Sequence, residues 1–142
     1  MTARGAGYCQ ELGRLFYLMR WLQPYAHSLL RIVAGFMFSL HGFQKLFGFF
    51  GGIGGHGATA HFFSMMWLAG CLETVGGILI LLGIATSPVA LVLSGEMAAA
   101  YFMQHAPRGF WPIVNGGELA VLYCFIFLFL FTAGGGRWSL RK

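Results

Sequence analysis

Four apolar stretches, each about as long as a membrane-crossing helix, account for most of this 142-residue chain. They run over about residues 28–49, 65–84, 88–105 and 113–133. A helix needs about 20 mostly apolar residues to cross the hydrocarbon core of a bilayer. Only 9% of the residues are charged, against about 25% in an ordinary soluble domain. The sequence therefore predicts an all-α protein, an integral membrane four-helix bundle formed by residues 26–142.

The same composition argues against several other classes of protein. An apolar content of 58% is too high for a disordered chain. The net charge is +5, but the basic residues are too few and too scattered to follow a phosphate backbone, so we expect no nucleic acid partner. No two histidines have the i, i+4 spacing of helical metal ligands, and we expect neither metal nor haem. The cysteines form no C-x-x-C pair, and packing is the expected role of Cys71 and Cys124.

Residues 1–25 form a separate N-terminal segment in this interpretation. Five apolar residues recur there at helical spacing, and Pro24 is expected to break the chain before the first span. The pattern predicts a short helix lying on the membrane surface; a mobile tail with a chance pattern is the alternative. The five apolar residues are Leu12, Leu15, Phe16, Met19 and Leu22.

The distribution of Lys and Arg predicts the orientation. Three arginines precede the first span, and three basic residues follow the fourth. The links after the first and third spans hold only Lys45 and Arg108. Because basic residues concentrate on the cytoplasmic side, both termini are predicted to be cytoplasmic.

Small residues recur at four-residue spacing within the spans, as they do where membrane helices approach closely. The alternative is that glycine is simply common in membrane helices. The pairs are Gly35/Ser39, Gly70/Thr74, Ser94/Ala98 and Gly95/Ala99.

Three of the four acidic residues, Glu73, Glu96 and Glu118, lie inside predicted spans on three different helices. A charge at bilayer depth costs at least about 2.5–3.5 kcal/mol, so these side chains are expected to point inward toward partners. Helical rise predicts a deep pair between Arg31 and Glu96. It also predicts an outer polar group that consists of His41, Lys45, Glu73, His105 and Glu118.

Two interpretations of these residues stay open. In the first, buried ion pairs fix the register of the helices. In the second, the outer group is a protonatable pocket, since carboxyl groups in apolar surroundings can exchange protons near neutral pH. Such a pocket suits a quinone-like head group or another proton-coupled small molecule. The aromatic residues expected to line it are Phe43, Phe47, Tyr101, Phe110 and Trp111.

Several motifs resemble the DoxX family. They are Arg31 with the HG-x-x-KLFG stretch that starts at His41, the ETVGG stretch from Glu73, and the NGGE stretch that ends at Glu118. The resemblance extends over about residues 28–140. It implies a four-helix protein of the bacterial or archaeal cytoplasmic membrane. Family members are described as oxidoreductases, and relatives include the small membrane subunit of thiosulfate:quinone oxidoreductase.

The leading hypothesis is a membrane subunit of a quinone-linked redox system. The expected catalytic residues are Glu73, Glu118 and His41. The expected quinone-binding residues are Arg31, Lys45, Glu96, His105, Asn115 and Trp111. The alternative is a structural or assembly subunit that packs in the lipid bilayer against other membrane subunits or a second copy, through the Phe-rich fourth span. A small-molecule or ion carrier is a third hypothesis, although four spans are few for alternating access.

Overall fold

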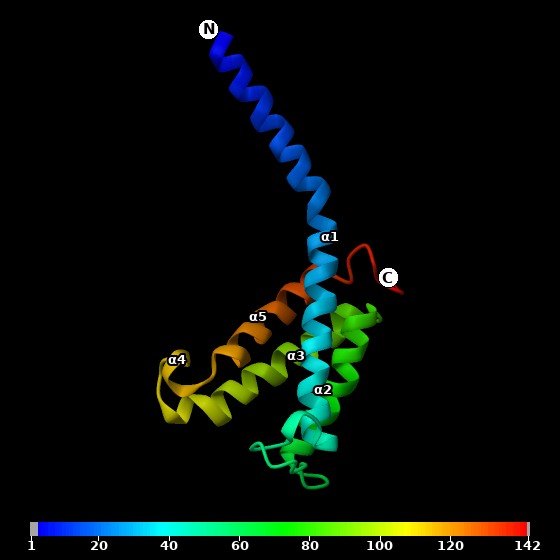
Figure 1. Ribbon diagram of the computed structural model, residues 1–142, viewed down its shortest axis with the longest axis vertical. Coiled ribbons are helices and arrows are strands. Elements are labelled where there is room, and N and C mark those ends of the chain that lie inside the picture. Colours follow the sequence, from blue (N-terminus) through cyan, green and yellow to red (C-terminus); the bar gives the residue numbers. More distant parts are fainter. Residues whose placement is uncertain (1–2, 142) are drawn as a thin grey trace.

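The computed structural model describes residues 3–141, with side chains from residue 10 onward, and these residues fold almost entirely into helices (Figure 1). The expected all-α class is confirmed. Three short helical turns, η1 (Phe49–Gly51), η2 (Tyr101–His105) and η3 (Ala106–Arg108), lie in the links. The helices are α1 (Ala3–Phe47), α2 (Met65–Leu82), α3 (Thr86–Ala100), α4 (Pro112–Asn115) and α5 (Glu118–Ala133).

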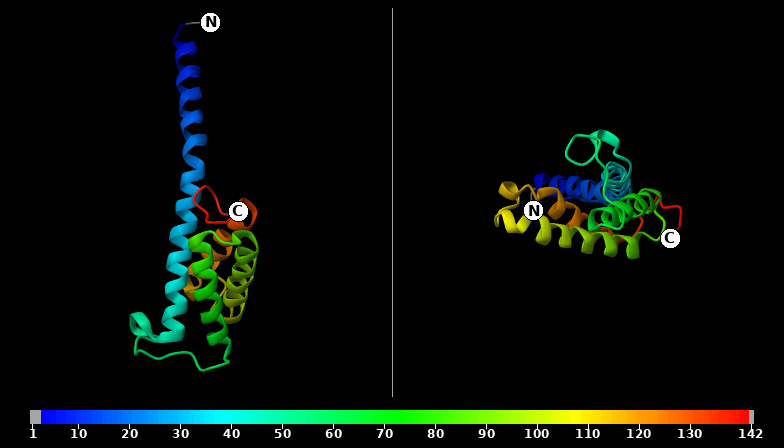
Figure 2. Two further views of the ribbon diagram at one scale, coloured as in Figure 1. Left: turned by 90° about the vertical axis from the view of Figure 1, so that its right-hand side faces the viewer. Right: turned by 90° about the horizontal axis from the view of Figure 1, so that it is seen from below.

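The helices form two hairpin-like pairs that pack against each other. α1 lies along α2, and α3 lies along α5, while α2 and α3 provide most of the contact between the pairs (Figure 2). Large apolar side chains from four helices meet between the pairs and are almost fully buried. These core residues include Phe38, Ile80, Leu93, Phe127 and Leu130.

Small residues bring α1 and α2 into direct backbone contact. A Cβ built on Gly77 would lie 2.7 Å from the backbone nitrogen of Ser39, and one built on Gly35 would lie 2.4 Å from that of Leu81. The predicted close approach is therefore confirmed for the pairs that begin at Gly35 and Gly70. It is wrong for Gly95, which is exposed and has no atom within 4 Å of a built Cβ.

The first helix is longer than predicted, because it continues through Pro24 without a break. Proline removes one helical hydrogen bond, the one that the carbonyl of Arg20 would accept, and the helix continues on both sides of it. Ser28 Oγ adds a bond to the Pro24 carbonyl at 2.8 Å. Residues 10–23 are exposed and project beyond the bundle as an arm (Figure 1). The predicted separate surface helix is wrong in this respect, since the arm and the first span form one continuous helix, which bends where the arm leaves the bundle (Figure 1).

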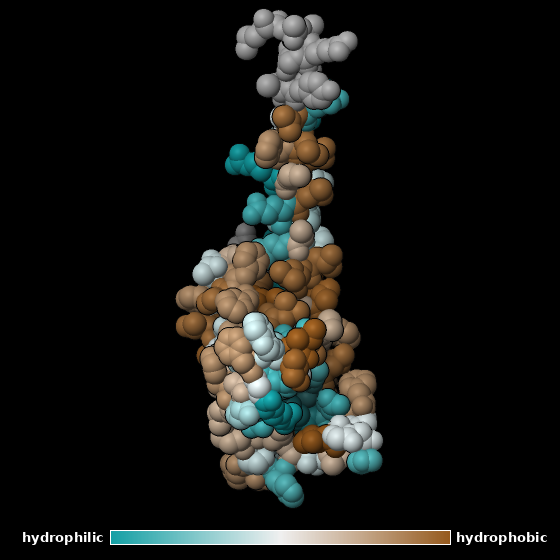
Figure 3. Space-filling model, turned by 90° about the vertical axis from the view of Figure 1, so that its left-hand side faces the viewer, coloured by the Kyte–Doolittle hydropathy of each residue, from teal (hydrophilic) through white to brown (hydrophobic). Residues whose placement is uncertain are grey.

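The other predicted spans correspond to helices with adjusted ends. α2 and α3 begin within two residues of the predicted positions, whereas the fourth span is divided at Gly116 and Gly117 into α4 and α5. Within the described residues, α2 alone is both long and apolar enough to cross a bilayer. α5 is apolar but has 16 residues. Much of the bundle surface is apolar (Figure 3), and the four-span arrangement stays a prediction.

Candidate functional site

An ion pair joins the last turn of α1 to the middle of α2. Lys45 Nζ donates to Glu73 Oε1. This pair is the one salt bridge among the residues that the structure describes. The Glu73 side chain is 3% exposed and the Lys45 side chain 23%. The second carboxylate oxygen of Glu73 is buried without a protein partner. The predicted grouping of Lys45 with Glu73 is thus confirmed, and one buried carboxylate oxygen has no protein partner.

Glu96 of α3 lies near this ion pair. Both of its carboxylate oxygens are buried, and neither has a hydrogen-bond partner in the described part of the chain. The carboxyl group lies within electrostatic range of Glu73 and Lys45. The predicted pair between Arg31 and Glu96 is therefore wrong. Glu96 lies ten residues into α3, about 15 Å along its axis, and so at the level of Glu73 rather than at the end of the bundle.

Arg31 instead joins the end of α2 to the segment that follows α5. The residue is fully buried, and all of its guanidinium nitrogens donate to backbone carbonyls. These carbonyls belong to the end of α2 and to the segment after α5. These bonds connect α1 to the end of α2 and to the segment after α5, and the expected quinone-binding role of Arg31 stays a prediction. The acceptors are Ile80 at 2.6 Å, Leu81 at 2.5 Å, Gly135 at 2.7 Å and Trp138 at 2.9 Å.

His41 and Tyr123 lie at the edge of this group. The half-buried His41 ring has its centroid 6.3 Å from that of Tyr123 and lies within electrostatic range of Lys45. The buried Tyr123 lies within electrostatic range of Glu73. Tyr123 was not expected from the sequence, although its spacing from the core residue Phe127 places both on one face of α5. We call His41, Lys45, Glu73, Glu96 and Tyr123 the carboxylate cluster.

The remaining residues of the predicted site lie elsewhere. Asn115 is buried and organises the link between α3 and α5: its amide donates to the Gly109 carbonyl at 2.7 Å, and its Oδ1 accepts from Gly117 N at 2.8 Å. His105 Nδ1 lies 3.1 Å from the Asn115 carbonyl oxygen. These bonds hold the link together, which is a structural task separate from the cluster.

Glu118 and Trp111 are both exposed. Glu118 is the first residue of α5, where a negative charge complements the helix dipole. Trp111 is 65% exposed and packs its ring on Phe110. The single predicted pocket is therefore divided into the buried carboxylate cluster, the Asn115 link and these surface positions.

The chemistry available in the cluster is that of proton transfer and hydrogen bonding. It combines an amine, an imidazole, a phenol and two carboxyl groups that together leave three buried oxygens without partners. Within residues that the structure describes, no three His, Cys, Asp or Glu side chains are grouped as metal ligands. Cys71 and Cys124 are free thiols, and Cys124 Sγ lies 3.6 Å from Ser94 Oγ.

Comparison with known proteins places this site in a family. The family model described as DoxX matches residues 26–106, which include His41, Lys45, Glu73 and Glu96. An uncharacterized protein of Haemophilus influenzae is 46% identical over 122 residues, covering 83% of this chain and 90% of the relative. No solved structure matches. The family indicates a membrane protein, in agreement with the apolar surface. The chain belongs to the DoxX family.

Proposed function

We propose that this protein is the membrane subunit of a quinone-linked redox system, in which the carboxylate cluster binds the quinone head group and delivers protons to it. One observation carries the proposal: ionisable side chains from four helices converge on one buried place where three carboxylate oxygens have no protein partner. Burying polar groups without partners is costly, so such an arrangement favours a ligand or a proton there. The resemblance to DoxX proteins supplies the expectation of redox chemistry.

The cluster residues suit this task. Reduction of a quinone to a quinol takes up two electrons and two protons; the electrons would come from a membrane-associated dehydrogenase partner. Lys45 is partly exposed and can donate to a quinone carbonyl oxygen. Glu73 and Glu96 can hold and release protons at the same place. His41, at the edge of the cluster, is suited to exchange these protons with water outside.

The experiment measures quinone reduction in membranes that contain the full-length protein, with decylubiquinone as acceptor. Glu73→Gln keeps the size of the side chain but removes its exchangeable carboxyl proton, and we expect the rate to fall about a hundredfold, as for loss of a general acid or base. His41→Ala should lower the rate as well. Thermal unfolding of the purified variants separates lost activity from lost folding.

Asn115→Ala is not a suitable control, because Asn115 holds a link together. Glu118→Gln is the matched control, since it makes the same chemical change at an exposed position. Unchanged quinone reduction in both folded Glu73→Gln and folded His41→Ala would refute the proposal.

A structural or assembly subunit is the second candidate. The observation in its favour is the exposed arm of α1, which carries large apolar side chains such as Phe16 and Tyr17, both more than half exposed. Phe125 and Phe129 on α5 are exposed too. This function predicts that trimming residues 1–20 abolishes co-purification of a second membrane protein while quinone reduction does not depend on Glu73.

A further inference from the structure

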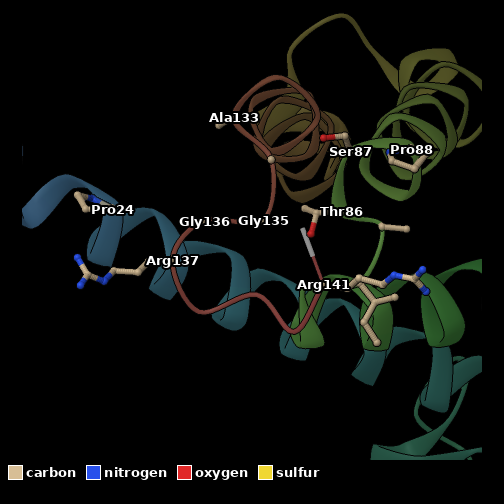
Figure 4. Close-up of a pocket in the computed structure, with 12 residues that line it drawn as sticks. Pro24, Thr86, Ser87, Pro88, Ala133, Gly135, Gly136, Arg137 and Arg141 are labelled. Carbon is tan, nitrogen blue, oxygen red and sulfur yellow. The ribbon is translucent and has the colours of Figure 1, made fainter.

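A cavity of about 1040 Å³ opens at the end of the bundle opposite the carboxylate cluster. It lies between the start of α3, the end of α5 and the segment that follows α5 (Figure 4). Pro24 of α1 also lines it, and Lys45 follows Pro24 by 21 residues, about 30 Å along the helix. The cavity is therefore remote from the proposed quinone site. No acidic residue lines it, whereas Arg137 and Arg141 do.

Thr86 provides a buried polar group without a partner in this cavity. The residue is 4% exposed, and its hydroxyl oxygen makes no hydrogen bond within the described residues. It lies beside Gly135, and its side chain is among those that line the space (Figure 4). A buried hydroxyl without a partner is uncommon in proteins, and a bound oxygen acceptor would satisfy it.

The start of α3 offers further donors at the same place. Ala85 occupies the capping position with φ of 48° and has no side-chain acceptor for the first amides of the helix. Thr86 and Ser87 are the first two residues of this 15-residue helix, and both line the cavity. Uncapped amides and the positive end of the helix dipole together favour an anion.

The charges around the cavity have the same sign. Arg137 and Arg141 lie at opposite sides of it (Figure 4). Arg31 is buried next to it, because its Nε donates to the carbonyl of Gly135, a lining residue. All the acceptors of Arg31 are neutral carbonyls. The guanidinium groups of the exposed Arg137 and Arg141 point outward from the rim of the cavity (Figure 4), and no carboxylate is among its lining residues, which leaves room for a ligand with negative charge.

Aromatic residues indicate the depth of the cavity in a membrane. Trp21, Tyr25 and Trp138 form a chain of rings with centroid distances of 5.1 and 5.7 Å, and the Arg137 guanidinium lies 5.0 Å from the Tyr25 ring centroid. Trp and Tyr are enriched at the level of the lipid headgroups. The basic termini predict that this end faces the cytoplasm, where anionic lipids attract Lys and Arg.

We propose that this cavity binds the phosphate of an anionic phospholipid. The Thr86 hydroxyl and the Ser87 amide donate to phosphate oxygens, while the exposed side chains of Arg137 and Arg141 turn inward from the rim and neutralise the charge from the two sides. Arg31 adds a fixed positive charge behind the glycine segment 134–136. This binding is independent of the proposed quinone chemistry, because it uses the other end of the bundle.

Native mass spectrometry of the full-length protein in neutral detergent tests the proposal. Phosphatidylglycerol is titrated against phosphatidylcholine, and the number of retained lipids is counted. We expect preferential retention of phosphatidylglycerol. Arg137→Gln and Arg141→Gln should each weaken it about fivefold, as for one basic residue near an anionic headgroup. Thr86→Val should also weaken it, whereas Thr86→Ser, which keeps the hydroxyl, should not.

Two matched controls lie outside the cavity. Arg108→Gln removes an exposed arginine, and Thr132→Val removes an exposed hydroxyl that is bonded to the Phe129 carbonyl. Both should retain phosphatidylglycerol like the unmodified protein. If Thr86→Val, Arg137→Gln and Arg141→Gln all retain phosphatidylglycerol as well as the unmodified protein does, the proposal is overturned.

Inorganic phosphate forms a separate arm of the experiment and distinguishes a lipid from a free anion. Displacement of phosphatidylglycerol only at a large excess of phosphate supports a lipid ligand. Binding of inorganic phosphate that depends on Thr86, with no preference for phosphatidylglycerol over phosphatidylcholine, would overturn the assignment to a lipid.

Discussion

Replacement of Gly42 by alanine tests the close packing of α1 against α2, on which the position of Lys45 next to Glu73 depends. A Cβ at residue 42 would lie 2.2 Å from Thr74 Oγ1, 2.5 Å from Thr74 N and 2.8 Å from the Gly70 carbonyl oxygen. Ordinary contacts begin at about 3.5 Å. Two of the three atoms belong to the backbone of α2, so they cannot move by a change of rotamer. The helices must separate by about 1 Å.

The expected cost follows from this displacement. Overpacking a well-packed interior costs about 1–3 kcal/mol, and the upper part of this range applies because backbone atoms oppose the new methyl group. Alanine recovers about 0.5–1 kcal/mol relative to glycine inside a helix. We therefore expect Gly42→Ala to lower the free energy of unfolding by about 2 kcal/mol.

Gly95→Ala is the control, because nothing lies within 4 Å of a Cβ at that position. It should leave the protein as stable or stabilise it by up to about 1 kcal/mol. Unfolding of both variants by SDS in mixed micelles, followed by circular dichroism, gives the comparison. If Gly42→Ala is as stable as Gly95→Ala, the described contact between α1 and α2 is wrong.

Three further substitutions test individual interactions. Lys45→Met leaves the buried Glu73 without its cation and should lower the free energy of unfolding by about 3 kcal/mol, the lower end for a broken buried pair because Lys45 is partly exposed; adding Glu73→Gln should recover most of the loss in the same SDS titration, and no recovery would argue against the pair. Arg31→Lys cannot reproduce four bonds to carbonyls and should cost about 2 kcal/mol in that titration, whereas the exposed Arg108→Lys should cost nothing measurable. Asn115→Ala removes the bonds that close the link before α5, so hydrogen exchange should show faster exchange in residues 109–117, and unchanged exchange would contradict their role.

The helices were predictable because lipid-spanning segments require long apolar runs, and glycine spacing identified the contact between α1 and α2. The course of the chain at Pro24 was not, since a proline inside a helix removes only one hydrogen bond, and the bonds on either side of it keep α1 continuous. The division of the fourth span depends on the amide of Asn115, which caps the turn at Gly117. Such a bond depends on geometry that periodicity does not contain.

The candidate site was predictable in part for a similar reason. Lys45 and Glu73 carry opposite charges inside predicted spans, where a charge needs a partner, and the two side chains form a salt bridge. The acceptors of Arg31 were not predictable, because they are backbone carbonyls, which every residue carries. The surroundings of Glu96 were not predictable, because helical rise gives only the depth of a residue along its own helix. Which neighbours the Glu96 side chain meets depends on how α3 packs against the other helices.

Quinone reduction by Glu96→Gln, compared with that by Glu118→Gln, tests the central claim most directly. Both variants replace one span glutamate by its amide, but Glu96 lies in the carboxylate cluster and Glu118 lies exposed at the start of α5. With both proteins folded and equally abundant in membranes, the cluster predicts a rate at least about tenfold lower in Glu96→Gln and an unchanged rate in Glu118→Gln. An unchanged rate in Glu96→Gln, or a loss confined to Glu118→Gln, would contradict it.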